Sequence, residues 1–230
     1  MDDTENIMQA KKISALFHHR TDQLILKNEF FRKLEQKFVT QEQADEFCSV
    51  FSNLVRQFPT LIALAISNID NEVIRVGLAV NLYQECGEGV VKKSHYQVFR
   101  RFLDSANITE ISQSEESIAL DWMGSHRDFM LNSENSESLI GLIAASEFLA
   151  EPALNRIYQV MHPLYGEREL DWGYFTEHLI LEKEHVNDIH MMFEQTVDSK
   201  AQRESVELGF NYGLQIWNSY FTSIAKLLFR

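Results

Sequence analysis

The sequence predicts an all-α fold: a single-domain bundle of about eight helices that spans residues 1–230. Apolar residues recur along nearly the whole chain at the three- and four-residue spacing that gathers them on one face of a helix. Only 9 Gly and 3 Pro interrupt this pattern, so long helices are allowed. No stretch alternates apolar and polar residues as a half-buried strand does, and no repeat or linker divides the chain.

The helices follow one another with short connections. Thr40 is the expected N-cap of the second helix, with Gln43 at the spacing of a capping box, and Asp70 is the expected N-cap of the third. The stretch "CGEG" ends the third helix, because glycine accepts the left-handed conformation of a helix C-cap. The polar stretch "SENSES" connects the fifth helix to the sixth. The expected spans are approximately 7–35, 41–66, 70–86, 94–105, 115–131, 136–165, 171–196 and 199–229.

Composition and charge exclude several classes of function. A formal net charge of −13 disfavours binding to nucleic acid and anionic membranes, since both require clustered Lys and Arg. No uninterrupted apolar run reaches the roughly 18 residues of a membrane span, and the first residues are polar, unlike a signal peptide. Cys48 and Cys86 are expected to be free thiols of a reducing compartment. We therefore expect a cytoplasmic protein whose partner is a small molecule.

Three polar residues interrupt the apolar face of the helix expected at 171–196. His178, Glu182 and His185 share that face with leucine, isoleucine and methionine side chains. A bare carboxylate in such a stripe is costly, and a bound cation would compensate its charge. The spacing His-x3-Glu-x2-His therefore favours metal binding.

Two further carboxylates occupy apolar faces elsewhere in the chain. Glu147 lies among the apolar residues of the helix at 136–165, with Glu151 as the competing candidate one turn later. Glu85 closes the apolar face of the helix at 70–86, and Glu88, in the glycine turn, is its alternative. His95 follows Glu85 by ten residues at the start of the next helix.

These residues form a candidate set of three carboxylates and three imidazoles. Oxygen and nitrogen ligands without thiolate suit iron or manganese and permit zinc. Three carboxylates suit two metal ions, since a carboxylate can bridge, and helix bundles commonly hold such dinuclear sites. Without metal, each histidine would instead be a hydrogen-bonded core residue and each glutamate part of an ion pair. The set is Glu85, His95, Glu147, His178, Glu182 and His185.

The stretches that carry these residues resemble one known family. "NLYQECGEG", "KKSHYQVFRRFL", "ASEFLAEPALNRI" and "YFTEHLILEKEHVNDI", in this order, resemble the heme-oxygenase-like diiron oxidases and oxygenases over about residues 20–200. The resemblance implies a heme-oxygenase-like bundle and assigns the same six residues as metal ligands. Many members have Asp where this chain has Glu182, so the binding mode of this carboxylate could differ.

The resemblance also implies chemistry and partners. Family members use two Fe(II) ions and O2 on amino acids or fatty acids, with N-oxygenation, oxidative C–C cleavage or nitrile formation as outcomes. We accordingly expect a carboxylate-bearing substrate, an amino acid in preference to a fatty acid, together with an external electron donor and a homodimer. Tyr83, Phe148 and Tyr174 are candidate pocket walls, and Arg156 is a candidate partner for the substrate carboxylate. The alternatives are a metal-free, cysteine-dependent enzyme of the related thiaminase-like branch, and a non-enzymatic interaction module.

Overall fold

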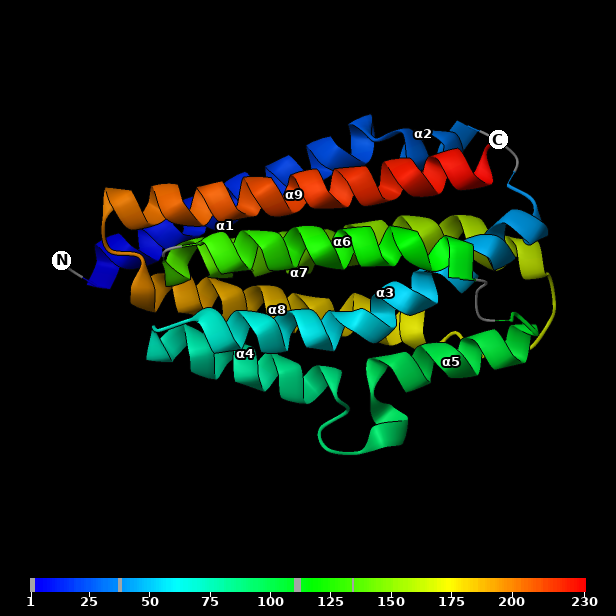
Figure 1. The fold of residues 1–230 in the computed structure, drawn as a ribbon, viewed down its shortest axis with the longest axis horizontal. Coiled ribbons are helices and arrows are strands. Elements are labelled where there is room, and N and C mark those ends of the chain that lie inside the picture. Colours follow the sequence, from blue (N-terminus) through cyan, green and yellow to red (C-terminus); the bar gives the residue numbers. More distant parts are fainter. Residues whose placement is uncertain (1–2, 37–38, 110–112, 134) are drawn as a thin grey trace.

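The computed structural model describes residues 3–36, 39–109, 113–133 and 135–230, and gives only the backbone of residues 3–5, 113–116, 178–180 and 182 (Figure 1). Within these ranges the chain forms nine α-helices, two short 3-10 helices and no strand, which confirms the all-α prediction but exceeds the eight helices expected. The helices are α1 (Asp3–Lys27), α2 (Glu29–Gln36), α3 (Gln41–Asn68), α4 (Glu72–Glu85), η1 (Val91–Lys93), α5 (His95–Ala106), α6 (Gln113–Asn132), α7 (Ser136–Met161), η2 (His162–Tyr165), α8 (Gly173–Thr196) and α9 (Lys200–Leu228).

The prediction of one helix over 7–35 is wrong, because Asn28 separates α1 from α2. The Asn28 side-chain oxygen accepts a hydrogen bond from the Phe30 backbone N–H at 2.9 Å, as an N-cap does. Its amide nitrogen donates to the Asn218 side chain of α9 at 2.9 Å. This second bond joins the α1–α2 connection to α9, so helical periodicity alone does not reveal the break. The span predicted at 136–165 is α7 followed directly by the 3-10 helix η2, whose first turn contains Pro163.

Side-chain caps mark the first residues of α3 and α4, the two helices that precede the site in the sequence. Thr40 and Gln43 form the predicted capping box at the start of α3. Asn71, and not Asp70, caps α4: its side-chain oxygen accepts from the backbone N–H groups of Val73 and Ile74. The helix therefore starts one residue later than predicted, and the exposed Asp70 carboxylate lies 3.9 Å from the Arg75 guanidinium.

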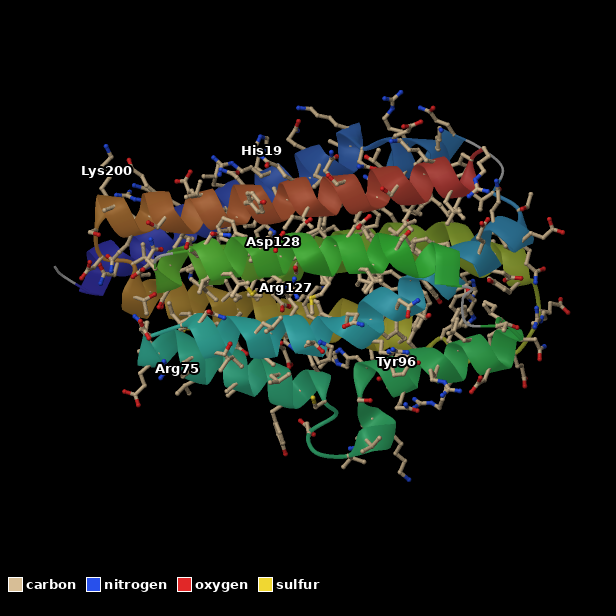
Figure 2. All side chains as sticks on the ribbon, in the orientation of Figure 1. His19, Arg75, Tyr96, Arg127, Asp128 and Lys200 are labelled. Carbon is tan, nitrogen blue, oxygen red and sulfur yellow. The ribbon has the colours of Figure 1, made fainter. Side chains whose placement is uncertain are left out.

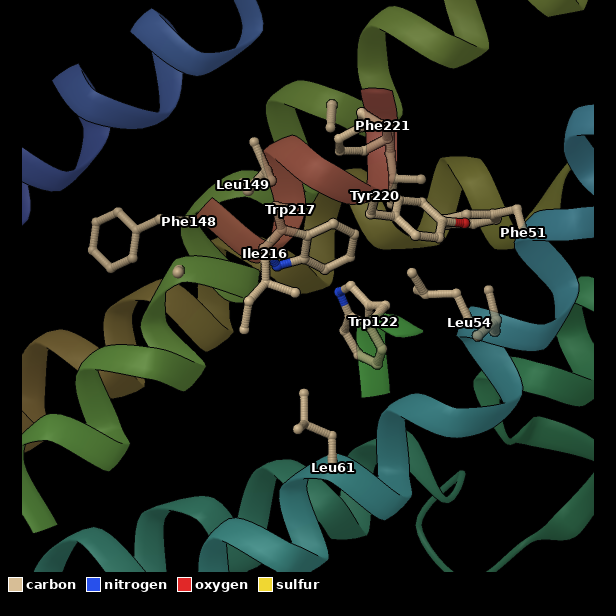
Figure 3. Packing of buried hydrophobic residues seen from close by; sticks show 14 of the residues in the cluster. Phe51, Leu54, Leu61, Trp122, Phe148, Leu149, Ile216, Trp217, Tyr220 and Phe221 are labelled. Carbon is tan, nitrogen blue, oxygen red and sulfur yellow. The ribbon is translucent and has the colours of Figure 1, made fainter. Parts of the chain in front are cut away.

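The central helix of the bundle is α7, whose residues from Leu139 to Leu149 are all buried. It packs along α9 and also contacts α1, α3 and α8, while α4 and α5 lie at an outer edge of the bundle (Figure 1). Trp122 of α6 and Trp217 of α9 meet in the core with ring centroids 5.3 Å apart (Figure 3). Burial of this apolar surface is the main favourable contribution to folding.

Glycines allow α7 and α9 to approach closely. A Cβ on Gly209 would overlap the carbonyl oxygen of Ser138, and a Cβ on Gly141 would overlap that of Val206. Gly213 lies one turn after Gly209 and would meet the Ala145 Cβ at 2.6 Å. The two backbones therefore touch along this face, and α7 is held in a fixed position relative to the rest of the bundle.

Helix α3 is by length and composition apolar enough to cross a membrane. A core helix of this length meets the same criteria. In this structure α3 packs against α4, α5, α6 and α7, and buried side chains line it from Ala44 to Ala65. The expectation that the protein binds no membrane stays a prediction.

Acidification is expected to destabilise the fold through His126, which is fully buried in α6. Its Nδ1 donates to the Trp122 carbonyl at 2.9 Å, and burial lowers its pKa from 6.5 to about 4. Between these pH values the unfolded chain binds a proton that the folded chain does not, so stability falls as pH falls from 6.5 towards 4. The full loss is about 3 kcal/mol at 1.36 kcal/mol per pKa unit.

Urea unfolding of the wild-type protein and of His126→Leu at pH 7 and pH 5 measures this contribution. The carboxylates titrate equally in both proteins, so the difference in pH dependence isolates His126. We expect His126→Leu to lose less stability than the wild-type protein over this interval. His162→Leu, at an exposed histidine, is the control and should behave as the wild-type protein does. Equal pH dependence of His126→Leu and the wild-type protein would refute the assignment.

Candidate metal centre

The first half of the site lies where α4 ends and α5 begins. Glu85 is the last residue of α4 and His95 the first of α5, and the Glu85 Oε2 lies 2.7 Å from the His95 Nδ1. Both side chains are buried, with 3% and 6% of their surface exposed. Glu85 and His95 are only ten residues apart in the sequence, and the turn between α4 and α5 brings their side chains together.

The turn is tight because of its left-handed residues. Gly87, Glu88 and Gly89 have φ values of 71°, 54° and 80°, as the "CGEG" prediction requires. A Cβ on Gly87 would overlap the backbone of Lys93 and Ser94, so only glycine lets the start of α5 come this close to α4. Of the two candidate glutamates, Glu85 is buried and Glu88 is exposed to solvent.

The second half of the site joins α7 to α8. Glu147 Oε2 lies 3.1 Å from His185 Nδ1, and both residues are 1% exposed. The other oxygen of Glu147 accepts a hydrogen bond of 3.0 Å from the Asn81 amide of α4. Glu151, the competing candidate one turn later, is half-buried and lines a surface groove instead.

The two halves face each other in the interior. The His95 and His185 rings lie 6.5 Å apart between centroids and within 25° of parallel. The structure therefore brings together four of the six predicted residues from α4, α5, α7 and α8. The other two, His178 and Glu182, belong to α8, but their side chains lie outside the described residues. The role of all six as metal ligands stays a prediction.

The donor set suits iron. Each pair supplies one carboxylate and one imidazole, which are oxygen and nitrogen donors that iron accepts, and the paired donor atoms lie 2.7 and 3.1 Å apart. Among the described side chains, no group of three or more His, Cys, Asp or Glu has the arrangement of a complete metal site. The site therefore consists of two buried half-sites whose atoms fit iron by type.

Sequence reasoning did not single out Asn81 or Asp188. Asn81 was detectable, because it shares the apolar face of α4 with Leu78 and Glu85. Asp188 follows His185 by three residues on α8; burial raises its pKa, while His185 lowers it and Glu184 and Glu147 raise it further. This coupling depends on the approach of α7 to α8, which no local pattern shows.

A narrow apolar cavity of about 60 Å³ adjoins both half-sites. Its polar lining comes mainly from Glu85, Glu147 and Ser146, whose hydroxyl accepts a hydrogen bond from the Trp217 indole at 3.0 Å. Among the described residues that line it there is no Lys or Arg. The remaining lining residues are Phe51, Leu54, Val55, Phe58, Leu149, Ala150, Ala153, Leu154, Ile157, Tyr174, Trp217 and Phe221.

Only one of the three predicted pocket walls borders this cavity in the described structure. Tyr174 lines it, but Tyr83 is 55% exposed, because two residues along α4 turn it to the opposite side from Glu85. Phe148 packs instead against Phe17, with ring centroids 5.6 Å apart. Arg156 forms an ion pair with Glu35 in a separate surface groove. It does not line the cavity where a substrate carboxylate was expected to meet it.

Comparison with known proteins decides the family. Residues 45–218 match the sequence model of a family described as iron-containing redox enzymes. The chain belongs to this family. All four paired side chains lie within the matched segment, so an iron-containing redox enzyme carries two buried carboxylate–histidine pairs in its interior. No curated protein matches the chain.

Solved structures similar to this iron-containing redox enzyme share its heme-oxygenase-like fold. A CADD-like protein of unknown function from Nostoc punctiforme is 15% identical, with a TM-score of 0.78 over 97% of this chain and 100% of that one. A domain of unknown function with a heme oxygenase-like fold from Shewanella denitrificans is 10% identical, with a TM-score of 0.68 over 99% and 93%. A TenA homolog from Pseudomonas syringae pv. tomato is 10% identical, with a TM-score of 0.54 over 99% and 96%. At these identities the likeness shows the fold alone.

Proposed function

We propose that the protein is a non-heme diiron oxidoreductase that uses O2 to oxidise a small carboxylate-bearing substrate. The observation that carries the proposal is the pair of buried half-sites, Glu85 with His95 and Glu147 with His185, which face each other beside an apolar cavity. Buried carboxylates are rarely retained without a compensating charge, and bound cations would supply it. Membership of an iron-containing redox enzyme family supports iron as the metal.

Each half-site would hold one ion, with His178 and Glu182 as the expected additional ligands. When bound, ferrous iron supplies the electrons that activate O2. The Asn81 amide holds one oxygen of Glu147, which fixes the direction in which that carboxylate presents the other. The apolar walls keep bulk water from the reacting groups.

The cavity lining bears on the substrate. A passage walled by phenylalanine, leucine, valine and alanine favours an apolar chain or ring. The preference for an amino acid over a fatty acid therefore gains no support from the cavity, and an apolar amino acid or a fatty acyl chain fits its lining better than a polar amino acid. We keep N-oxygenation, oxidative C–C cleavage and nitrile formation as the reaction outcomes to test.

A metal-free, cysteine-dependent reaction has less support. Cys48 is fully buried in α3 and burial raises its pKa, which disfavours the nucleophilic thiolate. Cys86 is exposed in the turn after α4. Neither thiol lines the apolar cavity, so neither lies where a substrate would bind. In the non-enzymatic alternative the buried acids would pair with Lys or Arg, whereas Glu85 and Glu147 contact histidines.

Anaerobic titration with Fe(II) tests the proposal before any substrate is known. We expect about two irons per chain and a rise in melting temperature, because a ligand at 100 times its dissociation constant stabilises the folded state by about 2.7 kcal/mol. For a chain of this length, this corresponds to a shift of about 5–11 °C. Stopped-flow mixing with O2 and a panel of fatty and amino acids then identifies the substrate class by O2 consumption.

Two variants make the titration specific. His185→Ala should bind at most about one iron per chain and lose part of the thermal shift, whereas His162→Ala, at an exposed histidine outside the site, should keep both irons and the full shift. The proposal fails if the wild-type protein binds no iron at any ratio. It also fails if His185→Ala binds iron and consumes O2 as the wild-type protein does.

A further inference from the structure

The outer face of α4 carries an apolar stripe exposed to solvent. Val73, Val76, Val80 and Tyr83 are 38%, 58%, 47% and 55% exposed. They lie on the side of α4 opposite to Ile74, Leu78, Asn81 and Glu85, which face the interior. Figure 1 shows α4 at the edge of the bundle, and Arg75 marks the same edge in Figure 2. Single exposed apolar residues need no explanation, but four of them in succession along one helix face do.

The spacing of the stripe identifies the kind of surface that would cover it. The intervals between the four residues are three, four and three, which is the a/d pattern of a helix that packs against another helix. This pattern reads the same in both directions. An identical helix laid antiparallel would therefore place Val76 against Val80 and Val73 against Tyr83, twice each. The two-fold axis would cross the outer face of α4 midway between Val76 and Val80. A two-fold contact requires such self-complementarity.

The charges at the two ends of α4 favour the same arrangement. Asp70 and Glu72 are exposed at its N-terminal end, and Arg75, 3.9 Å from the Asp70 carboxylate, offsets one of these two negative charges. The segment after its C-terminal end exposes Lys92 and Lys93, which together outweigh the one acid there, Glu88. An antiparallel pair brings the acidic end of each copy towards the basic segment of the other, whereas a parallel pair would bring like charges together.

The segment after α4 also extends the contact area. A helix of 14 residues is about 21 Å long, which by itself gives a small interface. Val90 and Val91, which follow the glycine turn after α4, are 39% and 75% exposed and add further apolar surface there. A specific dimer interface needs about 1,000 Å² of buried surface in total. Both copies would contribute the stripe and these two valines to that area.

We propose that the protein forms a two-fold dimer through antiparallel packing of α4 against α4 of a second copy. The interior face of the same helix carries Asn81 and Glu85, so the dimer would stabilise the helix that positions one half of the site. Dimer formation does not depend on iron or on the proposed reaction, and the two proposals can therefore fail separately.

Sedimentation velocity of the full chain over about 1–100 µM tests the proposal. We expect a dimer for the wild-type protein and at least about 100-fold weaker association for Val80→Glu, because a buried charge at the centre of an interface is poorly tolerated. Leu208→Glu, which adds the same charge at a position of α9 that is 62% exposed, should leave the dimer intact. Circular dichroism melts should show that both variants stay folded, since both positions are on the surface.

Disulfide cross-linking tests the antiparallel register. In a Cys86→Ser background, chains with Val76→Cys should cross-link to chains with Val80→Cys more readily than either chain cross-links to itself. A wild-type monomer at 100 µM, a dimer unaffected by Val80→Glu, or preferential cross-linking of like with like would each overturn the proposal.

Discussion

Replacing Glu85 with alanine is expected to abolish O2 consumption, whereas Glu88→Ala leaves it largely unchanged. Glu85 is buried and lies 2.7 Å from His95, while Glu88 is exposed three residues later in the turn. Loss of the Glu85 carboxylate would remove a ligand from one of the two proposed iron ions. We expect the activity to fall on the order of 100-fold or more, since even partners that only orient a ligand contribute 10- to 100-fold.

The measurement combines iron content with O2 uptake. Glu85→Ala should bind at most about one iron per chain after anaerobic loading, and Glu88→Ala about two, as expected for the wild-type protein. Alanine at position 88 keeps the left-handed conformation at a cost similar to that of glutamate, so the turn should stay intact. If Glu85→Ala retained the iron content and rate of the wild-type protein, Glu85 would not be a metal ligand.

Gly209→Ala is expected to cause a large loss of stability, since its added Cβ makes the shortest contact of any glycine in the chain. The new Cβ would overlap the backbone carbonyl of Ser138 on α7, and backbone atoms cannot turn aside as a flexible side chain can. Overpacking of this kind costs about 3 kcal/mol at the upper end of its usual range. For a chain of this length, the melting temperature should fall by about 6–12 °C.

Gly124→Ala is the matched control, because nothing lies within 4 Å of the added Cβ on α6. In a helix interior this change should stabilise the protein by about 0.5–1 kcal/mol. Urea unfolding should therefore show a lower free energy of unfolding for Gly209→Ala and a higher one for Gly124→Ala. A stable Gly209→Ala protein would show that α7 and α9 can separate without cost. Because α7 carries Glu147, we also expect Gly209→Ala to weaken iron binding at the Glu147–His185 half-site.

The sequence predicted the helices well where their signals are local. The Thr40 capping box and the glycine turn at 86–89 are confirmed, because both depend on residues within a few positions of one another. The break at Asn28 was missed, since its amide is held by Asn218 of a helix nearly two hundred residues away. Tyr83 was assigned to the pocket although the same periodicity that placed Glu85 inside turns Tyr83 to the surface.

By itself, the sequence determined the all-α class and the presence of polar residues on apolar helix faces, including Glu85, Glu147 and His185. Helical periodicity is a property of each segment alone, so these assignments need no knowledge of neighbouring helices. Only the tertiary structure decided that Glu85 meets His95, that Glu147 meets His185, and that the adjoining cavity is apolar. These outcomes depend on how closely helices pack, as at the glycine contact between α7 and α9, and side-chain packing between distant segments leaves no local pattern in the sequence.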